Sequence, residues 1–242
     1  MVLNRNNISR LGFLCAAVTL FASCQFNGIT GSGDVTTEKR SIQSEFKSIE
    51  AGKGLDIVLE QSNNTSVTVV ADDNLQKHIT TKVENGVLII SSDYNSYRNV
   101  KMKKVVVQMP FIEGITIKSG AKLDSRNTIK SPSISIESSS GASITIQIES
   151  EKAICEASSG SSITINGKAI NLETASSSGS TIDAEKLLSN DIRASASSGS
   201  NTDVYPLISL KADASSGGNI HYHNIPKNLN KKSSSGGGIT KE

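Results

Sequence analysis

One short pattern recurs six times in the second half of the chain, and it restricts the possible folds more than any other feature. Each copy contains two serines, a glycine and then a run that mostly alternates polar and apolar residues. The glycines of the six copies are 18 to 20 residues apart, and they are Gly141, Gly160, Gly179, Gly199, Gly217 and Gly236. A fixed period of this length is the signature of a solenoid, in which each repeat is one structural unit stacked on the next.

The residues around each glycine alternate with period two, which indicates strands on both sides of a corner. Around Gly141, for example, isoleucines occupy positions 134, 136, 144 and 146. Successive side chains of a strand point to opposite faces, so these positions face inward and the polar residues between them face solvent. Glycine suits the corner because it adopts backbone conformations that other residues resist. The two serines are expected to form turns by bonding nearby backbone groups, and the alternative is a serine ladder that binds a ligand.

These observations predict an all-β protein, a single-stranded parallel β-helix with coils of about 19 residues. Leucine-rich repeats do not fit because their leucine and asparagine pattern is missing, and calcium-binding nonapeptide repeats have about half this period. We expect regular coils over residues 126–242. Residues 41–125 are expected to form less regular coils of the same solenoid, with the Gly54 segment as the first coil. The sequence Asn85-Gly86 between apolar runs predicts a hairpin there.

The beginning of the chain predicts export. Arg5 and Arg10 precede an apolar run over residues 11–21, which is too short to span a membrane. Basic residues, a short apolar run and small residues before a cleavage point are typical of a signal peptide. We therefore expect residues 1–23 to be a signal peptide.

Cys24 is predicted to carry a lipid. It directly follows Ala22-Ser23, as in a bacterial lipobox, so it would be the acylated first residue of the mature protein. The alternative is ordinary signal cleavage with an incidental cysteine. Residues 24–40 hold the predicted lipidated cysteine and are rich in Gly, Ser and Thr, a composition that predicts a flexible tether.

Charge and cysteine content narrow the class of partner. Two of the 25 basic residues lie in the signal peptide, which leaves 23 basic against 23 acidic residues. A neutral chain without a basic stripe is unlike a nucleic-acid-binding protein, and it leaves the lipid as the expected membrane contact. Cys155 would be the one other mature cysteine, so no disulfide is expected. It occupies an inward position and is expected to be a buried apolar residue.

Two groups of outward residues are candidates for chemistry. Glu137 and Glu156 are one coil apart, and the spacing of strands is close to the carboxylate separation of retaining glycosidases. Asp183, Asp203 and His221 occupy the same position of three successive coils. They form the one candidate cation site, because two carboxylates and an imidazole suit zinc or a similar ion. The alternative is that His221 hydrogen-bonds one of the carboxylates. No catalytic residue, metal or cofactor is assigned.

The chain also resembles a known family. The lipobox, the segment 46–59, the segment 83–90 and the Ser-Ser-Gly coils together look like the putative auto-transporter adhesin, head GIN domain family. The resemblance covers about residues 35–242, and it implies a β-helical, lipid-anchored envelope protein of Gram-negative bacteria. We therefore expect an outer-membrane lipoprotein that faces the periplasm or the cell surface. Its expected function is non-enzymatic, as an adhesion, binding or structural module for polysaccharide or protein. The alternative is a polysaccharide lyase or hydrolase built on the same fold.

Overall fold

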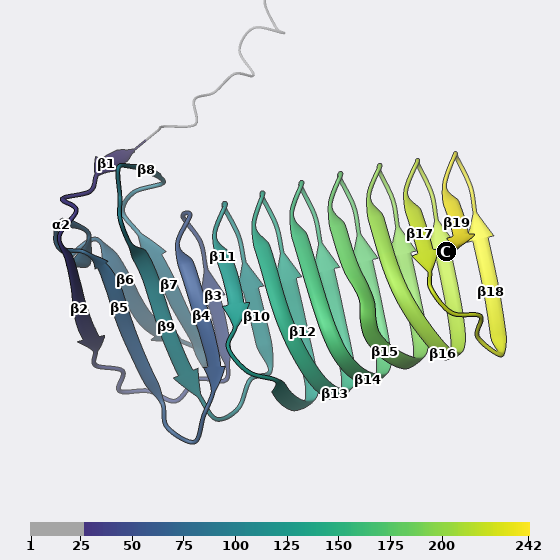
Figure 1. Ribbon diagram of the computed structural model, residues 1–242, viewed down its shortest axis with the longest axis horizontal. Helices are drawn as coiled ribbons and strands as arrows, with labels where there is room; N and C mark the ends of the chain where they lie inside the picture. The colour runs from purple at the N-terminus through teal and green to yellow at the C-terminus, as the bar shows by residue number, and fades with distance from the viewer. Residues whose placement is uncertain (1–26) are drawn as a thin grey trace, which may run out of the picture.

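The described part of the computed structural model, residues 27–242, is one elongated stack of β-coils (Figure 1). Seventeen strands belong to one continuous sheet, and two short strands form a separate pair. This architecture confirms the predicted all-β solenoid with coils of about 19 residues. The predicted signal peptide and Cys24 lie outside the described residues.

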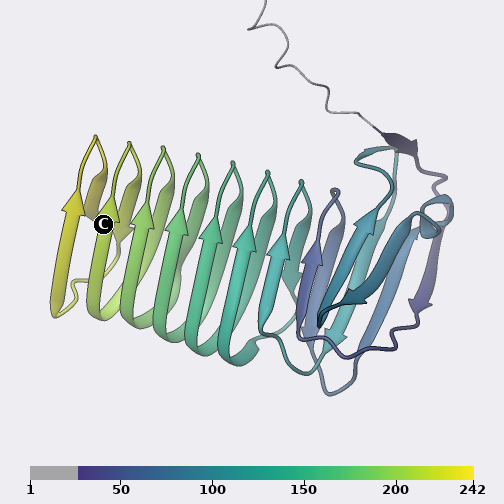
Figure 2. The same cartoon turned by 180° about the vertical axis from the view of Figure 1, so that it is seen from behind.

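The regular coils follow one another in chain order. Each has two flat sides, which we call face 1 for the strand segment before the corner glycine and face 2 for the segment after it. A wide bend joins face 2 to face 1 of the next coil, and both views show sharp corners along one edge and bends along the other (Figures 1 and 2). The strands are β10 (Gly114–Ile117), β11 (Lys122–Ser125), β12 (Ile129–Ser138), β13 (Ser143–Ala157), β14 (Ser162–Ser176), β15 (Thr181–Ala196), β16 (Asn201–Ala214), β17 (Asn219–Tyr222), β18 (Asn228–Ser233) and β19 (Gly238–Lys241).

Each corner is a tight turn with two successive left-handed residues. In the coil of Gly141, Ser140 has φ 53° and Gly141 has φ 71°, and the N–H of Ala142 donates to the carbonyl of Ser139 at 3.2 Å. Positive φ at both central residues defines a type I′ turn. The N–H of Gly141 also donates to the carbonyl of Ser159 in the next coil at 3.1 Å. The corners are therefore hydrogen-bonded to each other along the stack, like the strands.

The core is a set of aliphatic columns that run along the solenoid. Ile144, Ile163 and Ile182 are neighbours in register on face 2 and are completely buried. Cys155 lies in the matching column of face 1 and is also completely buried. The predicted inward positions are thus confirmed. Burying these columns gives the stack its hydrophobic stabilisation, because each coil covers the apolar edge of its neighbour.

The first coil is separated in sequence from the coil on which it stacks. Its strands are β3 (Ser48–Ala51) and β4 (Asp56–Gln61), with the corner at Gly54. These strands pair in parallel with β10 and β11, so that Ile49 lies beside Ile115. The Gly54 segment is therefore a coil, as predicted, and residues 62–110 are inserted between it and the next one.

The inserted residues cover the N-terminal end of the stack. The strands β7 (Val87–Ser92) and β9 (Lys103–Met109) pair in parallel with β3 and β4. The strands β6 (Ile79–Glu84) and β5 (Ser66–Asp72) then pair antiparallel with β7 and β9, and α2 (Asp73–Gln76) connects them. Asn85-Gly86 forms the two-residue turn between β6 and β7, which confirms the predicted hairpin. The separate pair consists of β1 (Gly28–Thr30) and β8 (Ser96–Arg98).

The prediction of a flexible tether is wrong for residues 28–40. The strand β2 (Val35–Arg40) pairs antiparallel with β5 along its whole length. Asp72, which is completely buried, accepts hydrogen bonds from the N–H groups of Gly33 at 2.9 Å and Met102 at 2.8 Å. The side chains of β2 are mostly exposed, so the strand is held by backbone hydrogen bonds and needs no apolar alternation.

Candidate binding surface

Two rows of serines run along the corner edge, and they have different environments. The first row follows the corner glycine directly and is buried, as at Ser161, Ser180 and Ser200. The hydroxyl of Ser180 donates to the carbonyl of Ala157 at 2.8 Å and accepts from the N–H of Ser177 at 3.1 Å. The buried row therefore ties the three corners of Gly160, Gly179 and Gly199 to the preceding coil, which is a structural role.

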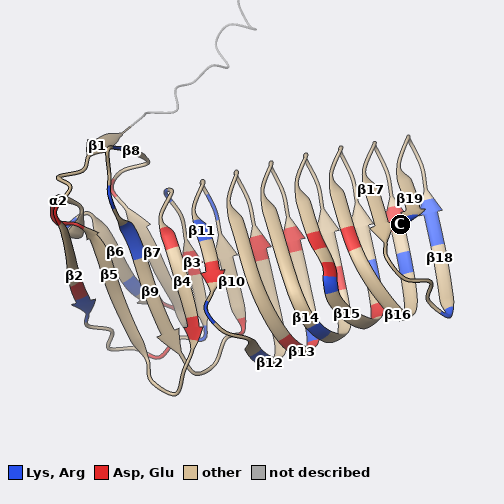
Figure 3. Cartoon of the chain, in the orientation of Figure 1, with Lys and Arg blue, Asp and Glu red and all other residues tan. Residues whose placement is uncertain are grey.

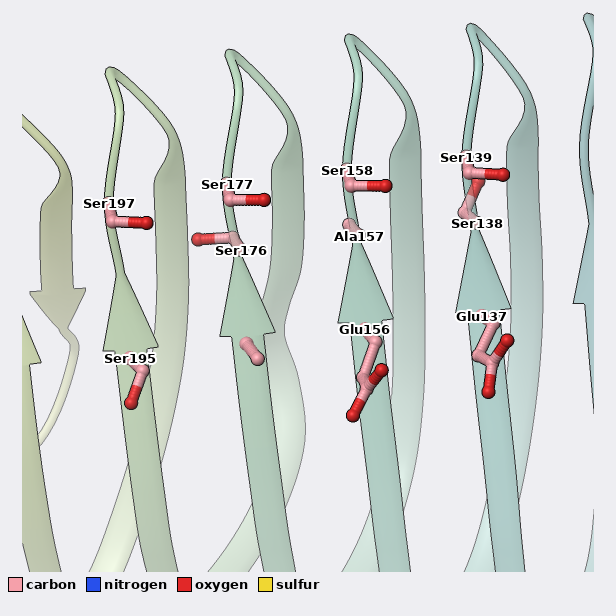
Figure 4. Close-up of a pocket in the computed structure, with 11 residues that line it drawn as sticks. Glu137, Ser138, Ser139, Glu156, Ala157, Ser158, Ser176, Ser177, Ser195 and Ser197 are labelled. Carbon is pink, nitrogen blue, oxygen red and sulfur yellow. The ribbon is translucent and has the colours of Figure 1, made fainter.

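The second row lies two residues before the glycine and is half-exposed; we call it the open serine row. Its members are Ser139, Ser158, Ser177 and Ser197. Figure 4 shows their hydroxyl groups pointing in the same direction. Among the described residues, none of these four hydroxyls has a hydrogen-bond partner. They are free to donate to or accept from a ligand that lies along the edge.

A shallow depression of about 280 Å³ adjoins the open serine row on face 1. The next outward position holds Glu137 and Glu156 in β12 and β13 (Figure 4). In β14 and β15 the same position holds the small residues Ala175 and Ser195. The short side chains leave the surface lower beside the two glutamates. We call the open serine row together with these four residues the serine strip.

The serine strip is negatively charged at one end. Glu137 and Glu156 are neighbours in register and exposed, and neither forms an ion pair within the described chain. Two carboxylates at strand spacing repel by about 1 kcal/mol in water. By contrast, Glu173, on the same face nearer the bend, pairs with Lys152 at 3.4 Å. The strip thus offers hydroxyls and unpaired carboxylates, which suit a polar ligand rich in hydrogen-bond donors.

The candidate cation site lies on face 2, away from the serine strip. Asp183, Asp203 and His221 are neighbours in register, as expected. However, Nε2 of His223 lies 3.2 Å from Oδ1 of Asp203, and Nδ1 of His221 lies 2.9 Å from Oε1 of Glu242. The expected bond from His221 to an aspartate of the stack is therefore wrong.

No group of three or more His, Cys, Asp or Glu residues within 27–242 could hold a metal ion. The imidazole of His221 turns toward Glu242, and Asp203 is contacted by His223, so the aspartates and His221 do not converge on one point. The partner of Asp203 is instead His223, an outward residue two positions beyond His221 in the sequence. Register places both histidines on face 2, but it does not show toward which carboxylate each imidazole turns.

Cys155 has no access to a ligand. Its thiol is completely buried, and burial raises the pKa of Cys155 to about 12. A thiol with this pKa stays neutral at physiological pH, and the thiolate is the nucleophilic form. This confirms the expectation that Cys155 is a buried apolar residue.

Comparisons with known proteins agree with this description. A family model described as putative auto-transporter adhesin, head GIN domain, matches residues 45–226. The fold is similar to the crystal structure of a putative adhesin from Bacteroides fragilis, with 24% identity and a TM-score of 0.81, over 89% of this chain and 100% of that one.

Two further crystal structures share the fold. A putative lipid binding protein from Parabacteroides distasonis is 18% identical, with a TM-score of 0.71, over 89% of this chain and 100% of that chain. A putative adhesin from Parabacteroides merdae is 16% identical, with a TM-score of 0.70, over 89% and 99% of the two chains. The search among curated proteins gave no match.

Proposed function

This chain belongs to the putative auto-transporter adhesin, head GIN domain family, and on that premise we propose that it is a non-enzymatic binding module of the cell envelope. The serine strip is the proposed binding surface, and its ligand is a polysaccharide or an extended segment of protein. Both ligands present hydrogen-bonding groups at regular intervals. A rigid row of side chains at strand spacing, about 4.8 Å, can contact such a ligand at several successive coils.

The observation that carries this proposal is the open serine row. Four hydroxyls on successive coils point the same way and have no partner in the described chain, whereas the buried serines on the other side of the same turns donate to backbone carbonyls. The fold therefore does not require the open hydroxyls. Each one can contribute a hydrogen bond to a ligand, worth about 1 kcal/mol net.

Binding to glycan and protein arrays tests the proposal. The double variant Ser158→Ala/Ser177→Ala should weaken binding about tenfold or more, because two hydrogen bonds of about 1 kcal/mol each are removed. The matched control is Ser159→Ala/Ser178→Ala, which removes the neighbouring exposed hydroxyls at the tip of the corner. Equal binding by both double variants and the parent would show that the serine strip is not the binding surface.

The alternative of a polysaccharide-acting enzyme rests on Glu137 and Glu156. They lie on adjacent strands at the edge of the same depression, where a general acid and a nucleophile of a retaining mechanism could sit. Release of reducing ends or unsaturated sugars from any glycan, lost in both Glu137→Gln and Glu156→Gln, would establish the enzyme. Saturable binding without turnover supports the binding module.

We also propose that Cys24 carries the lipid that holds the protein at the outer membrane. The support is the sequence around Cys24, where Ala22-Ser23 directly precedes the cysteine. Cys24→Ala should release the protein from membranes washed with carbonate. A variant that stays with the membrane would contradict lipidation at this residue.

A further inference from the structure

A row of exposed aliphatic side chains lies on the bend edge, opposite the corners. It occupies the bends of four successive coils, and each of its side chains is at least 39% exposed. We call it the aliphatic ridge, and its members are Ile170, Leu188, Leu207, Ile208 and Ile225. Ile170, Leu188 and Leu207 line a shallow depression of about 490 Å³, whose rim also holds Glu149 and Lys168. Exposed apolar side chains that gather along one edge are typical of an interaction site.

The repeats themselves show that the fold does not require aliphatic residues at these positions. The coil position of Leu188 holds Lys168, Glu149 and Lys130 in the three preceding coils. Ile170 likewise occupies the coil position of Glu151. Figure 3 shows charged residues of both signs where β12, β13 and β14 pass through the bend. The position of Leu188 is thus charged in three earlier coils and holds Tyr205 in the next one, although the coils are built alike.

We propose that the aliphatic ridge joins two copies of this chain in a parallel dimer. The arrangement of the two copies rests on the lipid anchor proposed above. Cys24 lies three residues before Asn27, so these residues can span only about 10 Å. The strand β1 lies at the N-terminal end on the corner side, whereas the ridge lies on the bend side of the later coils (Figures 1 and 2). A chain anchored beside β1 therefore holds its ridge away from that membrane.

A second copy in the same membrane has the same orientation, and this selects the symmetry. In this dimer the long axis of each copy stands along the membrane normal. A two-fold axis parallel to that normal brings the two bend edges together and keeps both anchors on one side. An isologous interface needs a patch that is complementary to itself. The ridge meets this condition because its own side chains carry no charge, and the neighbouring Glu149 and Lys168 have opposite signs.

The size of the ridge indicates a weak dimer. Four coils at about 4.8 Å spacing give a length of about 15 Å, which fits a transient interface better than an obligate one. Two copies held in one membrane share a high effective concentration, so that a weak contact is sufficient.

Disulfide cross-linking of the full chain in membranes tests this arrangement. Ile170→Cys, Leu188→Cys and Ile225→Cys, each made singly, should form dimers of twice the chain mass on mild oxidation, because identical residues face each other across a parallel two-fold axis. Thr145→Cys, exposed on face 2, is the control and should stay monomeric. The parent chain should not cross-link, since Cys155 is buried. Adding Leu188→Glu and Leu207→Glu to Ile225→Cys should reduce the dimer at least tenfold, with an unchanged melting temperature.

Each other outcome overturns the proposal. Absence of any adduct in a ridge variant that reacts freely with a water-soluble maleimide means that the ridge is unpartnered. A variant that neither cross-links nor reacts has its ridge in lipid. An adduct of another mass identifies a different protein as the partner. Cross-links between Ile170→Cys and Ile225→Cys, without self-links, show an antiparallel pair. Ligand binding by the serine strip, measured on the same variants, reports separately on the proposed function.

Discussion

The buried serine row allows a stability prediction that separates structural from open serines. Ser180→Ala removes a hydroxyl that donates to the carbonyl of Ala157 and accepts from the N–H of Ser177. These two backbone groups also bond each other at 3.0 Å, so neither is left unpaired after the substitution. The cost is then the net value of two hydrogen bonds, about 1–2 kcal/mol, without the larger penalty of an unsatisfied buried group. Ala142 already occupies the same coil position and is buried, so alanine fits there.

Thermal and urea unfolding measure this cost. For a chain of this size, 1 kcal/mol corresponds to about 2–4 °C in melting temperature, so Ser180→Ala should melt about 2–8 °C lower than the parent. The matched variant Ser177→Ala removes an open hydroxyl and should change the melting temperature by no more than about 1–2 °C. Equal losses in the two variants, or none in Ser180→Ala, would refute the assignment of one row to structure and the other to binding.

Three further predictions follow from the burial of single residues. Ile163→Asp should unfold the coils around it, because a buried unpaired carboxylate costs several kcal/mol. The control Thr164→Asp, at an outward position, should melt within about 2 °C of the parent. Equal losses of stability in the two variants would show that the inward register is wrong. Burial alone would raise the pKa of Asp72, but hydrogen bonds from backbone N–H groups outweigh it and hold the pKa below its usual value of 3.8. The stability from Asp72 is therefore present above that value and lost as the pH falls through the lower folded-state pKa, and Asp72→Asn should remove this part of the acid transition in a pH series of urea melts. Cys155 should react with a thiol reagent at pH 8 only when the chain is unfolded; rapid reaction of the folded protein would contradict its burial.

The sequence was sufficient for the regular coils because their determinants are local. Period-two alternation identifies the inward columns of Ile144 and Cys155, and Ser-Ser-Gly identifies the corners, because the turn needs two residues with positive φ. The Asn85-Gly86 hairpin was predictable for the same reason. In each case the residues that determine the structure lie within one coil or one hairpin.

The N-terminal cap depends on pairings that local patterns do not contain. The coil of Gly54 stacks on the coil of Gly120, and the strands inserted between them pair with its opposite side. No alternation within either segment gives this order. The strand β2 was missed because its side chains are mostly exposed and show no apolar alternation, so the Gly, Ser and Thr content of residues 24–40 predicted a tether. For the candidate cation site, register was predictable but side-chain direction was not, and this is why the contact between His223 and Asp203 was unexpected.

The first coils provide an internal test of what the corner requires. In the coil of Gly54 the left-handed residue is Lys53, with φ 58°, and the position of the open serine row is Gly52. In the next coil that position is Lys118. Both corners still form the turn bond, from Leu55 to Gly52 and from Ala121 to Lys118. The corner thus needs glycine and a backbone that accepts positive φ, but it does not need serine. Turn formation therefore leaves the four successive serines of the open serine row unexplained, and a ligand that binds along the corner edge would account for them.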